Sequence, residues 1–218
     1  MHQQAQQSHA NEIDIAFQQS DVSKGGGQIY AANLFGGVGL RSGVISYTNL
    51  FGSSVNDNSN PIAKLVTNLD NPGKMGNSEA FWVYQYAVRI QKISAAAMTS
   101  AVAQDIVRFL SSVRLQFFVA SNRIRVLDLS GLHFGNVLNA IVSDASTLGS
   151  NSISLPVNQS SWISLPGQTV QKLPPNENFN ATLDCNLVGG TPSSLDSTPA
   201  SNPDFVFNFV MAGKRFTR

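Results

Sequence analysis

The stretch FWVYQYAVRIQKI, residues 81–93, decides the fold class because apolar and polar residues alternate along it with a period of two. One face of this stretch carries large apolar side chains, those of Trp82, Tyr84, Tyr86, Val88 and Ile90. The other face carries the polar residues Gln85, Arg89 and Gln91. Aromatic and β-branched residues in this alternation are typical of a half-buried strand. The sequence therefore predicts a long β-strand over residues 81–93.

On both sides of this stretch, shorter apolar or alternating segments are separated by turn signals. We predict strands over residues 13–17, 28–35, 44–50, 62–69, 113–120, 123–129, 153–157, 162–165, 179–187 and 205–211. Asn71-Pro72-Gly73 predicts a turn, because proline presets φ and glycine accepts a positive φ. Ser121-Asn122 fits a two-residue hairpin loop. Residues 132–142 fit either a strand or a helix, and residues 189–203 are predicted to form a long loop.

Residues 99–112 depart from the β pattern. Their apolar side chains follow a helical stripe made of Val102, Ile106, Phe109, Leu110 and Val113. Thr99 or Ser100 can cap the start of this helix, because a hydroxyl there accepts a hydrogen bond from the first turn. We therefore predict an amphipathic helix over residues 99–112.

Short strands with turn signals between them, and no repeating strand–helix units, argue against a parallel α/β sheet. We expect an all-β fold, a jelly-roll-type antiparallel β-sandwich with one inserted mid-chain helix. Residues 1–12 are rich in Gln and poor in apolar groups, so we expect a flexible N-terminal arm that an assembly could order. Residues 13–218 are expected to form a single β-sandwich (jelly-roll) domain.

Charge is scarce in this sequence: 12% of residues are charged, against about 25% in an average globular protein. The weakly charged surface suits either a subunit interface, whose core is depleted of charge, or simply a polar, uncharged exterior. A net charge of +1 and the lack of a Lys/Arg run argue against specific nucleic-acid binding. No leader-like or membrane-spanning apolar segment is evident, so we expect folding in a cytosol.

The residues that usually carry catalysis are few and scattered. His133 lies between two apolar residues, where a hydrogen-bonded structural role is more common than catalysis, and His2 and His9 have poor spacing for a metal site. No Asp/Glu pair with divided acid and base roles is evident. We predict that the protein is not an enzyme and that it has no catalytic residues, no cofactor and no metal ligands.

The positions of the glycines and of the single cysteine also indicate structural rather than functional roles. The glycines at positions 36, 37, 39 and 43 do not fit a phosphate-binding loop, so we interpret them as flexible turns. Cys185 is the only cysteine, which excludes an internal disulfide and a Cys-based metal site. It falls on the same face as Phe179, Leu183 and Leu187, so we expect a small buried hydrophobic residue.

Two groups of residues leave alternatives open. On a hairpin, Arg114, Arg123 and Arg125, with Arg108 close in sequence, could line one outer surface as a subunit contact, a phosphate or lipid-headgroup site, or a solvated face. The second group is the aromatic residues of the predicted strands, whose period-two spacing favours positions in the core or in an interface over stacking on sugars or bases. These are Trp82, Tyr84, Tyr86, Phe117, Phe118, Phe205, Phe207 and Phe209.

Two segments near the C-terminus resemble a known family. PVNQSSWISLPGQTVQKLPPNENFNATLDCNLV, residues 156–188, resembles the late strands of viral jelly-roll proteins, where a Pro-rich corner leads into an alternating strand. FVFNFVMAGKRFTR, residues 205–218, resembles the terminal strand, glycine and arginine of capsid proteins of tailless icosahedral bacteriophages. The resemblance covers about residues 81–218, and double-barrel capsid subunits are longer than this chain, which favours a single jelly roll or a minor vertex protein.

The resemblance implies a structural virion protein, a capsid subunit that self-assembles through lateral contacts. It implies copies of itself and other virion proteins as partners, possible contact with an internal membrane, and a location in the virion after folding in the host cytoplasm. The first alternative is a β-sandwich receptor- or carbohydrate-binding module. The second is a hydrolase, which would need a facing acid pair among Asp128, Asp144, Glu177 and Asp184, or His133 beside an acid.

Overall fold

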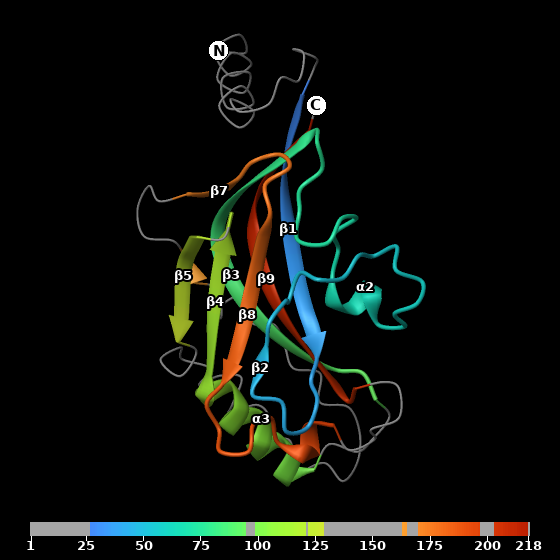
Figure 1. The fold of residues 1–218 in the computed structure, drawn as a ribbon, viewed down its shortest axis with the longest axis vertical. Helices are drawn as coiled ribbons and strands as arrows, with labels where there is room; N and C mark the ends of the chain where they lie inside the picture. The colour runs from blue at the N-terminus through green and yellow to red at the C-terminus, as the bar shows by residue number, and fades with distance from the viewer. Residues whose placement is uncertain are drawn as a thin grey trace.

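The computed structural model describes residues 27–94, 99–120, 122–128, 163–164, 170–196 and 203–217. These residues form two antiparallel sheets that pack face to face (Figure 1). The arm predicted over residues 1–12 and the elements predicted over residues 13–17, 132–142 and 153–157 lie outside the described residues.

The first sheet, sheet A, has the order β1-β9-β3-β6, and β7 also pairs with β3. Its members are β1 (Gln28–Gly39), β9 (Phe205–Thr217), β3 (Glu79–Lys92), β6 (Ile163–Ser164) and β7 (Gln171–Leu173). The two short strands pair with successive parts of the same edge of β3, because β6 lies opposite Gln85 and Tyr86 and β7 opposite residues 81–83. β6 and β7 therefore share the fourth position of the sheet, beside β3.

The second sheet, sheet B, has the order β2-β8-β4-β5. Its members are β2 (Ser46–Tyr47), β8 (Phe179–Cys185), β4 (Val113–Val119) and β5 (Asn122–Asp128). Along β4 and β8 every second residue is buried and those between are partly or fully exposed. This alternation is the period of two that a sheet with one face on the core requires.

The pairing of strands is nested along the chain. β1 pairs with β9, β2 with β8, β3 with β6 and β7, and β4 with β5, so the first strand meets the last and each next pair lies inside. Folding such a long hairpin over into two layers places four strands in each sheet and gives a jelly roll. The predicted all-β sandwich with one inserted helix is confirmed.

The core lies between the inner faces of the two sheets. Sheet A contributes Phe205, Phe207, Phe209 and Met211 from β9, all fully or almost fully buried as their spacing predicts. Phe51, from the connection between β2 and β3, enters this core and is fully buried. Its ring lies 5.0 Å from the ring of Phe179 and 6.2 Å from that of Phe209, so it contacts residues of both sheets.

Strand β3 confirms the long predicted strand but contradicts its predicted face. The register with β9 shifts between Val83 and Gln85, so Tyr84 is the extra residue of a β-bulge. The bulge reverses the alternation, which is why Tyr86 lies in the core while Trp82 packs against Phe216 in a separate cluster outside it. The prediction that Trp82 and Tyr84 share a face with Tyr86 is therefore wrong.

The segment predicted as a strand over residues 62–69 instead contains a helical turn, α2, over Ala63–Val66. Asn60 starts this turn, since its main-chain oxygen accepts from the amide of Ala63 at 3.0 Å. A strand would place Ala63 and Val66 on opposite faces, whereas one helical turn buries both. Tertiary burial thus decides against the local β propensity.

The hairpin between β4 and β5 is confirmed, but Asn122, which was predicted to lie in its loop, is the first residue of β5 and pairs with Val119. Ala120 has φ of 50°, the left-handed conformation that tight hairpin loops need.

The glycines interpreted as flexible turns lie within strand β1, except for Gly43. A Cβ at Gly36 would come within 2.3 Å of Cδ1 of Phe51, and one at Gly37 within 2.2 Å of the carbonyl oxygen of Phe207. The ring of Phe51 inside the sandwich therefore requires glycine at position 36, and the neighbouring strand β9 requires it at position 37. Gly43 has φ of 75° and does lie in a loop.

Helix α3 (Ser100–Ser112) closes one end of the sandwich, at the bottom of Figure 1. The hydroxyl of Thr99 accepts from the amide of Val102, which confirms the predicted cap. Ile106, Phe109 and Leu110 are buried as the helical stripe predicts, and the ring of Phe109 lies 6.3 Å from that of Phe207. The short helix η3 (Ser193–Leu195) packs beside α3.

Candidate functional site

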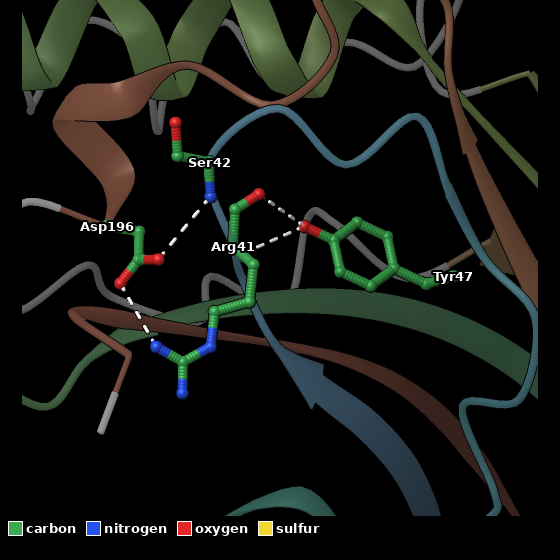
Figure 2. Close-up of polar contacts among 4 residues, drawn as sticks. All are labelled: Arg41, Ser42, Tyr47 and Asp196. Atoms are coloured by element: carbon green, nitrogen blue, oxygen red, sulfur yellow. Dashed lines mark hydrogen bonds and ion pairs between the residues drawn. The ribbon is translucent and has the colours of Figure 1, made fainter. Parts of the chain in front are cut away.

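A polar cluster, which we call the loop clamp, joins two connections at the end of the sandwich that α3 closes (Figure 2). It consists of Arg41, Ser42, Tyr47, Thr191 and Asp196. The carboxylate of Asp196 accepts from the guanidinium of Arg41 at 3.3 Å and from the amide of Ser42 at 3.5 Å. The loop after β1 is thereby fixed to the connection between β8 and β9.

Tyr47 extends this cluster into the interior of the loop end. Its hydroxyl accepts from the amide of Arg41 at 2.9 Å and lies 3.0 Å from the hydroxyl of Thr191. Thr191 in turn donates to the carbonyl of Val44. Burial raises the pKa of Tyr47, and its hydrogen bonds only partly oppose this effect.

The loop clamp is suited to holding loops rather than to chemistry. Asp196 is nine-tenths buried, and Arg41 and Ser42 both donate to it. The hydroxyl of Tyr47 is enclosed by main-chain and side-chain partners. A general base or nucleophile needs a free face toward a substrate, which this arrangement does not offer.

A second polar row runs across the outer face of sheet B, from β2 to β5. Asp184 accepts from the hydroxyl of Ser46 and from the amide nitrogen of Gln116, both at 2.8 Å. The side-chain oxygen of Gln116 accepts a hydrogen bond from the guanidinium of Arg123 at 3.3 Å. One side chain from each strand thus joins a continuous hydrogen-bonded row across this face.

Beside this row lies an open depression of about 340 Å³ on the same face. It is lined by Phe118 of β4 together with Asn178, Phe179, Asn180 and Thr182. An aromatic ring beside amide and hydroxyl groups is a combination that can hold a sugar. The amide of Asn180, however, already donates to the carbonyl of Thr48 and accepts from the amide of Ala181, so only part of the polar lining is available.

The four arginines do not form one basic surface. Arg108 on α3 is exposed and pairs with Asp105 at 3.2 Å. Arg114 lies on the outer face of β4, and Arg123 lies opposite the outward-facing Phe118. A register shift between β4 and β5 aligns position 125 with the inward-facing Phe117, which does not favour the shared outer surface considered as one alternative for these positions.

Of the acids considered for catalysis, Asp128 of β5 and Asp184 of β8 both pair with Arg114 of β4, which lies between them. Asp184 belongs to the polar row, and Glu177 lies in the turn before β8. His133 and Asp144 lie outside the described residues, as do His2 and His9. Cys185 is buried in the core, as predicted. Among the described residues, no group of three His, Cys, Asp or Glu could hold a metal ion.

A buried polar contact on the outer side of sheet A was missed by sequence reasoning. Asn208 of β9 is fully buried, accepts from the Arg89 guanidinium at 2.9 Å and donates to the carbonyl of Leu65 at 2.9 Å. Burial lowers the pKa of Arg89, whose guanidinium also lies 5.4 Å from the ring centre of Phe35. A lone polar residue in the apolar run FVFNFV was the available signal.

A further surface with binding capacity is the edge of sheet A at β1. Within the described residues, β1 pairs with β9 along one side, its other side pairs only through the isolated bridge from Gly36 to Thr67, and its first half is largely exposed. Tyr30, with 43% of its surface exposed, lies on this half. An unpaired strand edge presents main-chain donors and acceptors to any chain that can lie beside it.

No helix within the described residues has the length and apolar character needed to cross a bilayer.

Comparison with known proteins does not place the chain in a family: no protein-family model matches it, and no curated protein matches its sequence.

Proposed function

We propose that this protein is a structural virion protein, a jelly-roll capsid subunit that self-associates through lateral contacts in the icosahedral shell of a bacteriophage. The observation that carries the proposal is the nested strand pairing, with β1-β9-β3-β6 in one sheet and β2-β8-β4-β5 in the other. Jelly rolls of two four-stranded sheets are an architecture of viral capsid domains, shared with lectins and cupins.

The chemistry of the described surface supports an assembling role over catalysis. Asp196 and Asp184 are held by donors from neighbouring strands or loops. The loop clamp and α3 stiffen one end of the sandwich, and a shell subunit needs such a rigid body to transmit its symmetry to its neighbours. A weakly charged exterior lets like surfaces approach each other without strong repulsion.

The test is the mass and shape of the full-length protein across concentration and salt. We expect light scattering after size exclusion to give rings or closed particles, with regular images by negative-stain microscopy. Shell interfaces of standard size bury about 1,600 Å² each, and many weak contacts reinforce one another. A monomer at every concentration and salt, with no ordered particles, would contradict the proposal.

A receptor- or carbohydrate-binding module is the second candidate, supported by the depression beside Phe118. Its test is binding of immobilised glycans by the wild type and by Phe118→Ala. Loss of binding in the variant, with its thermal unfolding unchanged, would favour the binding module. Thr48→Ala is the matched control, since the Thr48 side chain is exposed and its hydrogen bond with Asn180 uses the main-chain carbonyl.

A further inference from the structure

We propose that the first half of β1 is a pairing edge for a second copy of this chain, so that two copies join β1 to β1 and form one continuous sheet. This inference deepens the proposed function, because it names one lateral contact of the proposed shell subunit. It nevertheless makes a separate claim, since a β1-paired dimer requires no shell.

The hydrogen bonds around Asn68 identify which main-chain groups face the open edge. The side chain of Asn68 donates to the carbonyl of Asn33 at 2.7 Å and accepts from the amide of Phe35 at 2.9 Å. In a strand, the N–H and C=O of one residue point to one side and those of the next residue to the other. The register of β1 with β9 is unbroken, so Ile29 and Ala31 also point away from β9.

The described residues cover only one half of this edge. Asn68 and an isolated bridge between Thr67 and Gly36 occupy the edge from Asn33 to Gly36. Within the described residues, the amides and carbonyls of Ile29 and Ala31 face no other strand. Figure 1 places this uncovered half of β1 at the end of the molecule opposite α3.

The composition of β1 lacks the features that usually prevent pairing between edges. Proteins protect edges with charged side chains, prolines or very short strands. β1 has twelve residues without a charged residue or a proline. The other described edge strands are protected: β2 and β6 have two residues each, β7 contains Lys172, and β5 contains Arg123, Arg125 and Asp128.

A second copy fits this edge because the edge is complementary to itself. In an antiparallel pairing around a two-fold axis at Tyr30, Ile29 of each copy exchanges both main-chain bonds with Ala31 of the other. Tyr30 then lies directly opposite Tyr30 of the second copy, at a non-hydrogen-bonded position. Its exposed ring gains an aromatic partner across the axis.

Ala31→Pro removes one outward N–H and leaves the ladder with β9 intact, because the amide of Ala31 does not point to β9. Proline is tolerated at edge positions whose N–H faces solvent. We expect the dimer of the variant to be about tenfold to a hundredfold weaker in sedimentation equilibrium, since each dimer loses two hydrogen bonds. Unchanged thermal unfolding at low concentration would verify that the fold is kept.

A cysteine pair tests the register in protein that is otherwise native. At a non-hydrogen-bonded position the two Cα atoms lie about 4.5 Å apart, which a disulfide can span. Tyr30→Cys should therefore form a covalent dimer on mild oxidation. Gln28→Cys, on the same face of β1, should not, because its counterpart lies roughly 13 Å away along the strand. The native Cys185 is buried and gives little background.

Each outcome decides the inference. Equal cross-linking of the two cysteine variants, or a dimer that Ala31→Pro leaves equally strong, would overturn it even if shells form. Protection of the Ile29 and Ala31 amides from hydrogen exchange that is independent of concentration would also overturn it, because the chain would then cover its own edge. Dimers that cross-link through Tyr30→Cys without forming particles would support the inference and contradict the shell.

Discussion

Gly36 and Phe51 should be strongly coupled in their effects on stability. A Cβ at Gly36 would lie 2.3 Å from the ring of Phe51, so Gly36→Ala forces the core to shift. Overpacking of this kind costs about 1–3 kcal/mol. Phe51→Ala leaves a cavity among the rings of Phe117, Phe179 and Phe209, and such truncations cost about 3–5 kcal/mol.

In the Phe51→Ala background, Gly36→Ala should raise the free energy of unfolding instead of lowering it. The added methyl then enters the cavity, and the backbone at Gly36 does not have a positive φ that would oppose alanine. Replacing a strand glycine under these conditions stabilises by about 0.4–1 kcal/mol through the unfolded state. Adding the two ranges gives a coupling free energy of roughly 1.5–4 kcal/mol.

The measurement is a double-mutant cycle by urea unfolding, followed by circular dichroism and analysed by linear extrapolation. Gly39→Ala is the matched control, because its Cβ would meet Pro203 at 2.3 Å rather than Phe51. Its cost should therefore be the same in both backgrounds. Equal costs of Gly36→Ala in the two backgrounds, within about 0.5 kcal/mol, would refute the packing argument.

Three further predictions concern the loop clamp and α3. Asp196→Ala should lower the free energy of unfolding, measured in urea, by about 1–3 kcal/mol, because the amide of Ser42 and the guanidinium of Arg41 lose their acceptor. Asp196→Asn should lower it by less, because the side-chain amide keeps one acceptor oxygen. Burial raises the pKa of Tyr47 above 10.0, so its contribution to stability should be intact below pH 10 and lost as the pH rises through the raised value. Tyr47→Phe should flatten that alkaline decline in thermal melts, and an unchanged decline would contradict the assignment. Thr99→Ala should cost about 0.5–2 kcal/mol by removing the cap of α3, and Thr99→Ser should restore most of this loss.

The fold was predictable where local pattern and tertiary burial agree. Alternation in residues 179–187 and 205–211 identified β8 and β9, and the helical stripe identified α3 and its cap. The bulge at Tyr84 was not predictable, because one inserted residue exchanges the two faces without changing the composition of the segment. The turn at Ala63–Val66 likewise depends on what covers it.

The candidate surfaces were less predictable than the fold. Arg41 and Asp196 are far apart in sequence, and only the nested pairing of the strands brings their loops together. Asp184 was considered as a catalytic acid, yet its partners Ser46 and Gln116 come from neighbouring strands whose register the sequence does not specify. Free edges could not be predicted either, because the alternation of residues indicates a strand but does not indicate which strands pair with it.

The nested pairing has a consequence for how the protein is made. β9 lies between β1 and β3, so sheet A cannot close until residues 205–217 have left the ribosome. At about 5–20 residues per second, roughly 10–40 s separate the synthesis of Gln28 from that of its partner Thr217. During this time β1 and β3 exist as nascent chain without the strand that joins them, and β1, which has no charged residue, has little protection against premature pairing.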